Sequence, residues 1–268
     1  MTDHPPFALS LYQLLFLLAS FSCMTHALLR YKTVMRSLSL KSALVWTASW
    51  WQLLYLLWIA LMGMMVGFYA IDFLLRAWAV DEFTGILLRN LAVQLGMLLA
   101  FFTFAPLSRR DVSICTLPWR KGFKVALYTL LACFPLLILT QWIVRIILLY
   151  FGVELEEQKL VSMIREIDSV PLIVLTFVMT VVLAPLTEEW LFRAGVYRFL
   201  KAHTQTWIAA LISATLFSLV HFNITSFLPL LLLALVLTYS YEASGSIRLP
   251  ILIHALFNAN TMIMLMLK

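Results

Sequence analysis

Apolar runs long enough to cross a lipid bilayer recur along the whole of this 268-residue chain. About 20 consecutive apolar residues span the hydrocarbon core of a membrane as an α-helix. Of all residues, 63% are hydrophobic and only 12% are charged, which is too little charge to cover the surface of a soluble domain of this length. The sequence therefore predicts an all-α fold, a polytopic bundle of about eight transmembrane helices.

Charged residues between the apolar runs mark the ends of the expected helices. No internal repeat or low-complexity linker interrupts them, so we expect a single integral membrane domain over 1–268. The glycines of GMMVG, 63–67, have the spacing of closely packed transmembrane helices. No role is assigned to 1–150, whereas 171–268 carries the candidate chemistry. The expected helices are about 7–29, 43–71, 86–107, 123–151, 171–200 (from Pro171 past Arg193), 206–222, 227–242 and 249–267.

Basic residues gather in short clusters between apolar runs, at 30–41, 109–124 and 198–201, whereas the stretch 154–168 is mainly acidic. By the positive-inside rule the basic loops face the cytoplasm and both termini face the outside of the cell (inner) membrane. The net charge of +6 is then a topology signal. We therefore expect the lipid bilayer as a partner, and no nucleic acid.

The stretch 154–168 has the pattern of a short amphipathic helix at the membrane interface. Its apolar residues, mostly three or four apart, are Leu155, Leu160, Ile164 and Ile167. Such a helix is either a connector resting on lipid headgroups or a gate over a lateral entrance, and the pattern leaves both open.

Ionisable residues inside apolar helices cost roughly 2.5–3.5 kcal/mol each on insertion, so they are candidate functional residues. The first cluster lies in APLTEEWLFRAG, 184–195. Glu188 and Glu189 point about 100° apart on a helix and do not serve one pocket equally. Glu189 lies four residues before Arg193, which favours an ion pair. Glu188 then has no local cation, and we predict that it is a general base or acid. The alternative is that both carboxylates mark the cytoplasmic helix end.

Two further polar clusters lie in the last helices. His221 ends an apolar run one turn after Phe217, and His254 and Asn258 share one helix face. Two hydrogen-bond donors on one face could stabilise a developing oxyanion. Taken singly, a helix histidine is usually a packed, hydrogen-bonded residue, and the His254–Asn258 pair could be an interhelical contact. The three clusters together favour a catalytic site.

Three short motifs, in their order and spacing, resemble the CAAX-protease and bacteriocin-processing family (CPBP, abortive-infection) of glutamate-type intramembrane endopeptidases. The resemblance covers about 171–268 and includes the AP before the glutamate pair, while Ala194 stands where the family commonly has Gly. The motifs are EExxxR (Glu188, Glu189, Arg193), FxxxH (Phe217, His221) and HxxxN (His254, Asn258).

The resemblance implies an intramembrane peptidase without a cofactor. Glu188 and His221 would activate water, and His254 and Asn258 would stabilise the oxyanion. The supporting residues would be Glu189, Arg193 and Phe217. Family substrates are membrane-anchored or hydrophobic peptides and proteins, from prenylated C-termini to peptide pheromones and bacteriocin leaders.

Three alternatives remain open at this point. Glu188, His221 and His254 also make a His₂Glu zinc set, although HExxH is absent. The same residues could be midplane ligands of a transporter or cation permease. A non-catalytic scaffold or immunity protein could retain the site and act by binding.

The depths of the candidate residues conflict in this scheme. Glu188 lies some 17 residues into its helix from the outer side, whereas His221 lies about 15 residues from the inner side, roughly 22 Å at helical rise. We therefore expect the helix before His221 to start in the aqueous phase or to tilt. A separation of Glu188 and His221 above about 10 Å contradicts a common site.

Overall fold

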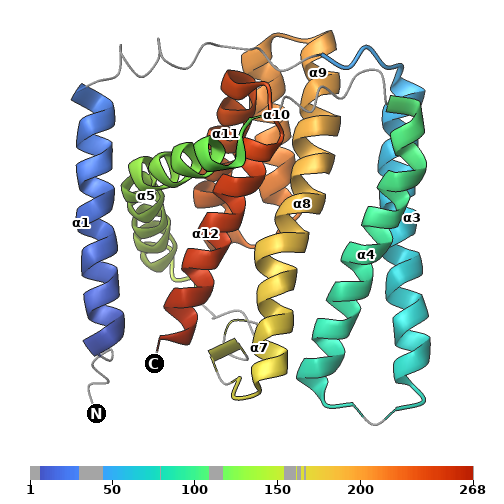
Figure 1. The fold of residues 1–268 in the computed structure, drawn as a ribbon, viewed down its shortest axis with the longest axis horizontal. Coiled ribbons are helices and arrows are strands. Elements are labelled where there is room, and N and C mark those ends of the chain that lie inside the picture. Colours follow the sequence, from blue (N-terminus) through green and yellow to red (C-terminus); the bar gives the residue numbers. More distant parts are fainter. Residues whose placement is uncertain are drawn as a thin grey trace.

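A computed structural model describes residues 7–29, 45–78, 80–108, 117–153, 161, 164, 165 and 167–267. Within these ranges the fold is a bundle of helices (Figure 1), two of which, η1 and η2, have the wider π-helical turn. The elements are α1 (Phe7–Leu29), α3 (Trp50–Leu75), α4 (Glu82–Ser108), α5 (Trp119–Tyr150), α7 (Val170–Phe177), η1 (Val178–Leu183), α8 (Ala184–Glu189), η2 (Trp190–Tyr197), α9 (Arg198–His203), α10 (Thr206–Leu219), α11 (Ile224–Ser244) and α12 (Arg248–Met266).

Seven of the described helical spans are long and apolar enough to cross a membrane, and α10 is a shorter apolar helix. Their outer surfaces carry many large apolar side chains, such as Trp51, Phe73 and Tyr150, which are at least 75% exposed. Lipid is the solvent in which such a surface is stable. The predicted polytopic bundle of about eight helices is confirmed, and the chain is an integral, multi-pass membrane protein.

Glycines bring α3 and α4 into close contact as an antiparallel hairpin. A Cβ atom on Gly63 would lie 2.3 Å from the carbonyl oxygen of Gly96, and one on Gly67 would lie 2.1 Å from that of Ala92. Only hydrogen fits at these positions, so the close packing predicted from GMMVG is confirmed. The hairpin joins the rest of the bundle through a buried apolar cluster that includes Leu56, Met97, Phe101, Val196 and Phe199.

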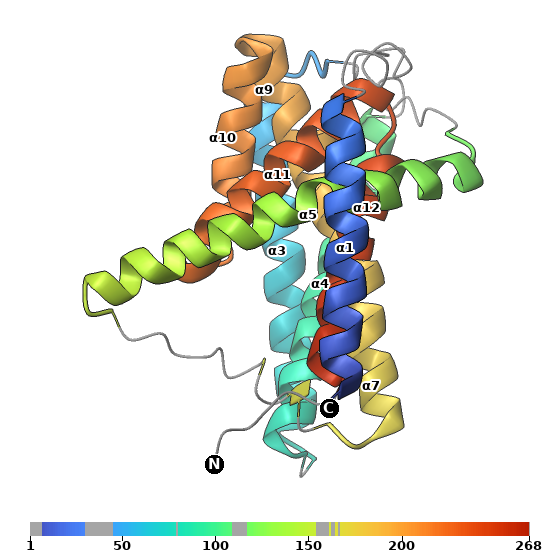
Figure 2. The same ribbon diagram turned by 90° about the vertical axis from the view of Figure 1, so that its left-hand side faces the viewer.

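The helix α5 lies crosswise to α1 (Figure 2). The rings of Phe16 on α1 and Phe134 on α5 meet edge to face at 4.6 Å. The hydroxyl of Tyr12 donates a hydrogen bond of 2.7 Å to Oδ1 of Asn260, which ties α1 to α12 as well. The N-terminal helix is thereby fixed to two helices of the C-terminal half.

The segments α7 to α9 form one continuous rod of 34 residues, Val170–His203, drawn from yellow to orange in Figure 1. At helical rise this is about 51 Å, longer than the hydrocarbon core of a bilayer. Glu188 lies 15 residues before the end of the rod at His203, and His221 lies 15 residues after the start of α10 at Thr206. The two residues therefore reach the same level, and the depth conflict expected from the sequence does not arise.

The acidic stretch 154–168, for which the sequence predicts a connector or a gate, lies largely outside the described residues. Of its apolar positions, Ile164 and Ile167 are described and buried, in a cluster with Val181 of η1 and Met262 of α12. Neither interpretation is tested.

Candidate functional site

Wide helical turns surround the two glutamates in the rod. The N–H of Ala184 donates to the carbonyl of Met179, five residues back, instead of to the carbonyl four back. Pro185 follows, and proline has no N–H to continue an α-helical ladder. The short α8 that carries Glu188 and Glu189 is thus bounded by π-helical η1 and η2, an irregularity that is frequent at functional sites.

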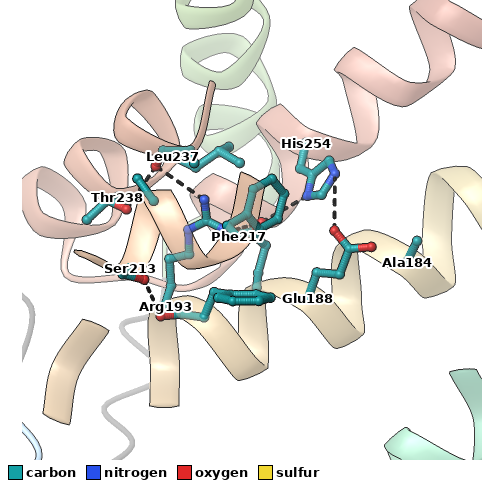
Figure 3. Close-up of polar contacts among 12 residues, drawn as sticks. Ala184, Glu188, Arg193, Ser213, Phe217, Leu237, Thr238 and His254 are labelled. Carbon is teal, nitrogen blue, oxygen red and sulfur yellow. Dashed lines mark hydrogen bonds and ion pairs between the residues drawn. The ribbon is translucent and has the colours of Figure 1, made fainter. Parts of the chain in front are cut away.

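Glu188 meets two imidazoles from two other helices. Its Oε2 lies 3.9 Å from Nε2 of His221 and 3.8 Å from Nε2 of His254. Both distances exceed a direct hydrogen bond. The glutamate side chain is 26% exposed and that of His254 is 5% exposed. Figure 3 shows Glu188 pointing from the rod toward His254. The structure therefore brings these three predicted residues together, well within the 10 Å limit.

Glu189 holds both Arg193 and His254. Its Oε1 accepts a hydrogen bond of 2.9 Å from Nη1 of Arg193 and lies 2.9 Å from Nδ1 of His254. Both side chains of the ion pair are fully buried. The predicted Glu189–Arg193 pair is confirmed. The contact to His254 was not predicted, because no spacing rule relates residues 65 positions apart.

The ring nitrogens of both histidines have defined partners. Nδ1 of His221 lies 2.7 Å from the carbonyl oxygen of Phe217. A carbonyl oxygen only accepts, and so does the Glu189 carboxylate beside Nδ1 of His254, so both Nδ1 atoms are donors. In their neutral forms both rings consequently present the lone pair of Nε2 toward Glu188.

Phe217 is a fully buried packing platform for the site. Its ring centroid lies 4.8 Å from that of His221 and 5.8 Å from that of His254. The guanidinium of Arg193 stacks on the same ring at 4.5 Å, in a cation–π contact. Nη2 of Arg193 also donates to the carbonyl of Ala234 on α11, at 3.2 Å. Phe217 lies between Arg193 and His254 in Figure 3, so it orients three polar groups at once.

Asn258 makes its hydrogen bond outside this group. Its Nδ2 donates to the backbone carbonyl of Thr180 in η1, at 2.7 Å. A primary amide has two N–H donors, and this bond uses one of them. The predicted role of Asn258 as an oxyanion donor stays a prediction.

The zinc alternative requires Glu188, His221 and His254 to surround one metal ion. Within the described part of the chain, no three or more His, Cys, Asp or Glu side chains are grouped so that they could hold a metal ion. Tetrahedral zinc with nitrogen and oxygen ligands places neighbouring donor atoms about 3.3 Å apart. The separations of 3.8 and 3.9 Å around Glu188 are wider than that. Both the absence of a cofactor and the zinc alternative stay predictions.

The fold and the site define a multi-pass helical membrane protein with a glutamate–histidine centre in its C-terminal half. Residues 170–260 match the family model described as "Type II CAAX prenyl endopeptidase Rce1-like". This range contains every predicted site residue. The resemblance to the CAAX-protease family is thus confirmed for this part of the chain.

Curated relatives match over a similar length. The chain is 27% identical over 114 residues to the "Putative membrane peptidase YdiL" of Bacillus subtilis (strain 168), covering 42% of this chain and 46% of the relative. It is 36% identical over 92 residues to an "Uncharacterized 24.3 kDa protein" of Escherichia coli, covering 32% of this chain and 42% of the relative. The chain thus spans less than half the length of these relatives. No solved structure matches it.

Proposed function

We propose that this protein is an intramembrane endopeptidase that hydrolyses peptide bonds of membrane-associated peptides or proteins. The observation that carries the proposal is the position of Glu188 Oε2, within 4 Å of Nε2 of both His221 and His254. A carboxylate that faces Nε2 of two imidazoles, while the nearby Arg193 is paired with Glu189, is suited to take a proton. The match to a peptidase family over residues 170–260 supports the same reaction class.

Glu188 and His221 would bind and activate the attacking water. A water molecule with hydrogen bonds of about 2.8 Å can join two polar atoms 3.9 Å apart. Glu188 takes one proton while the water oxygen bonds to the peptide carbonyl carbon, and the carbonyl oxygen becomes an oxyanion. The C–N bond then breaks, and the proton passes from Glu188 to the leaving amine. The products are a carboxylic acid and an amine.

His254 would stabilise the oxyanion. In its protonated form Nε2 donates a hydrogen bond, and the carboxylate of Glu189 at Nδ1 compensates the positive charge of the ring. A preorganised charged donor in a site of low dielectric is the kind of group that stabilises a tetrahedral intermediate. The ring needs no reorientation, because Glu189 and Phe217 already fix its plane.

The proposed substrate is a peptide held near the bilayer by its own apolar or lipid-bearing segment. The lipid-facing surface of the bundle and the family description favour a prenylated or otherwise hydrophobic peptide. We propose that the reaction uses no metal ion. Metal analysis of the purified protein and assays with a chelator test this part.

The test compares wild type with Glu188→Gln, purified in detergent, on an internally quenched peptide that ends in a prenylated cysteine motif. Mass spectrometry of native membranes would reveal cleavage of other anchored peptides. The proposal requires cleavage by wild type and a loss of at least about 1,000-fold in Glu188→Gln. Glu82→Gln, a change at an exposed residue at the start of α4, is the matched control. A Glu188→Gln variant that retains full biological activity would support a binding scaffold instead.

A further inference from the structure

The backbone carbonyl of Thr180 is left without a donor from its own helix. In an α-helix it would accept from the N–H of Ala184, but that N–H bonds to Met179. In a π-helix it would accept from residue 185, which is proline and has no N–H. Inside a membrane bundle a carbonyl without a partner is costly, so another group must satisfy it.

Asn258 supplies the missing donor, since its Nδ2 lies 2.7 Å from the Thr180 oxygen. We propose that Asn258 is a positioning residue, which holds α12 against the wide turn of the rod and so sets the distance between His254 and Glu188. This inference deepens the proposed function and rests on it for its kinetic part.

Two polar contacts fasten α12 to the rod, and each is called a fastening point below: His254 with Glu189, and Asn258 with Thr180. Asn258 and His254 lie four residues apart on α12, and their partners Thr180 and Glu189 lie nine residues apart on the rod. The rod and α12 are antiparallel neighbours (Figure 1), so both contacts lie along one seam. With one fastening point lost, α12 can rotate about the other. Nε2 of His254 then moves away from Glu188, where an added ångström costs much of the catalytic effect.

A direct oxyanion role for Asn258 predicts different behaviour. In that role, replacing Asn258 lowers the reaction rate whether or not the Thr180 carbonyl has another hydrogen-bond donor. In the positioning role, replacing Asn258 lowers the rate because the Thr180 carbonyl then has no hydrogen-bond donor. Pro185→Ala separates the two, because it gives position 185 an N–H that can reach the Thr180 carbonyl.

The experiment is a double-mutant cycle on Asn258→Ala and Pro185→Ala, with Asn260→Ala as the matched control. Asn260 is on the same helix, but its side chain bonds to Tyr12 of α1 and not to the rod. With the quenched prenylated peptide, Asn258→Ala should lower kcat about 30-fold with little change in KM. In the Pro185→Ala background the same change should cost only about 3-fold. Losses that are equal in the two backgrounds would overturn the positioning role.

Thermal unfolding in detergent gives a readout that needs no proteolysis. Asn258→Ala should lower Tm by about 3 °C in the wild-type background and by less in the Pro185→Ala background, whereas Asn260→Ala should show no such coupling. If the unfolding coupling is present and wild type cleaves no peptide, the proposed function fails and the fastening of α12 stands. If the unfolding effects add without coupling, the positioning role fails whatever the activity.

Discussion

Nδ1 of His254 and Oε1 of Glu189 lie 2.9 Å apart, on helices whose residues are 65 positions distant in the chain. The same oxygen accepts the hydrogen bond from Arg193. One carboxylate therefore both neutralises a buried cation and orients an imidazole whose other nitrogen faces Glu188. The two adjacent glutamates therefore differ in role. Glu189 is held between Arg193 and His254, whereas Glu188 has no such fixed partners and faces the two Nε2 atoms.

Replacing Glu189 by Gln should reduce activity and stability together. The amide removes the negative charge that balances Arg193 and His254, and it leaves a buried guanidinium unpaired. Breaking a buried ion pair on one side costs about 3–5 kcal/mol. Unfolding in detergent and peptide cleavage at a temperature below the lowered Tm measure the two effects. A Glu189→Gln variant that unfolds at the wild-type Tm would show that the ion pair does not stabilise the fold.

Replacing Arg193 by Lys should not be conservative. The guanidinium bonds Glu189 and the Ala234 carbonyl through different nitrogens and stacks on Phe217, which an ammonium group cannot do at once. We expect a loss of about 2 kcal/mol in the free energy of unfolding, measured by thermal or chemical unfolding. Arg89→Lys is a suitable comparison, because that arginine pairs with Asp72 at a part-exposed site away from the centre. Equal effects of the two substitutions would contradict the prediction.

Much of the fold could be predicted because apolar periodicity and helix length are local properties of the sequence. The expected helix at 206–222 is observed as α10, Thr206–Leu219, and the one at 249–267 as α12. The four-residue spacing of Glu189 and Arg193 likewise defines a contact within one helix. The convergence of Glu188, His221 and His254 was inferred from their positions on consecutive helices, and the structure brings them together.

Contacts between helices far apart in the sequence could not be predicted from local spacing. The bond from Asn258 to Thr180 depends on a carbonyl released by the wide turn before Pro185, and no side-chain pattern marks a released carbonyl. The rod continues to His203, beyond the expected end at about 200, and Lys201 and His203 lie in its last turn. The crosswise course of α5 follows from packing on α1, α11 and α12, which hydropathy does not encode.

Comparing Phe217→Leu with Phe217→Ala should separate two contributions of this side chain to stability: the stacking of its ring and the volume that it fills. Leucine keeps most of the apolar volume and loses the cation–π and ring contacts, for a cost of about 1 kcal/mol. Alanine adds a cavity at a site with no exposed surface, for about 3–5 kcal/mol. Because both imidazoles rest on this ring, we expect kcat to fall about tenfold even in the leucine variant. Unfolding curves and cleavage rates of the two variants check both points. A leucine variant with wild-type kcat would show that the ring does not orient the histidines.

Gly96→Val should disrupt the α3–α4 hairpin without touching the glutamate–histidine centre. A Cβ at Gly96 would lie 2.0 Å from the carbonyl oxygen of Gly63, so the two helices must separate. The hairpin buries Met97 and Phe101 in the cluster shared with the rod, and separation should lower the stability by several kcal/mol. Gly85→Val is the matched control, since that glycine on α4 meets only the flexible end of the Arg89 side chain, at 3.2 Å.

The measurement is the folded fraction of each variant after extraction in detergent, with cleavage activity normalised to folded protein. We expect Gly96→Val to lose most of its folded protein while the remaining fraction keeps its activity, and Gly85→Val to behave like wild type. A Gly96→Val variant that folds normally would mean that the close helix contact does not form.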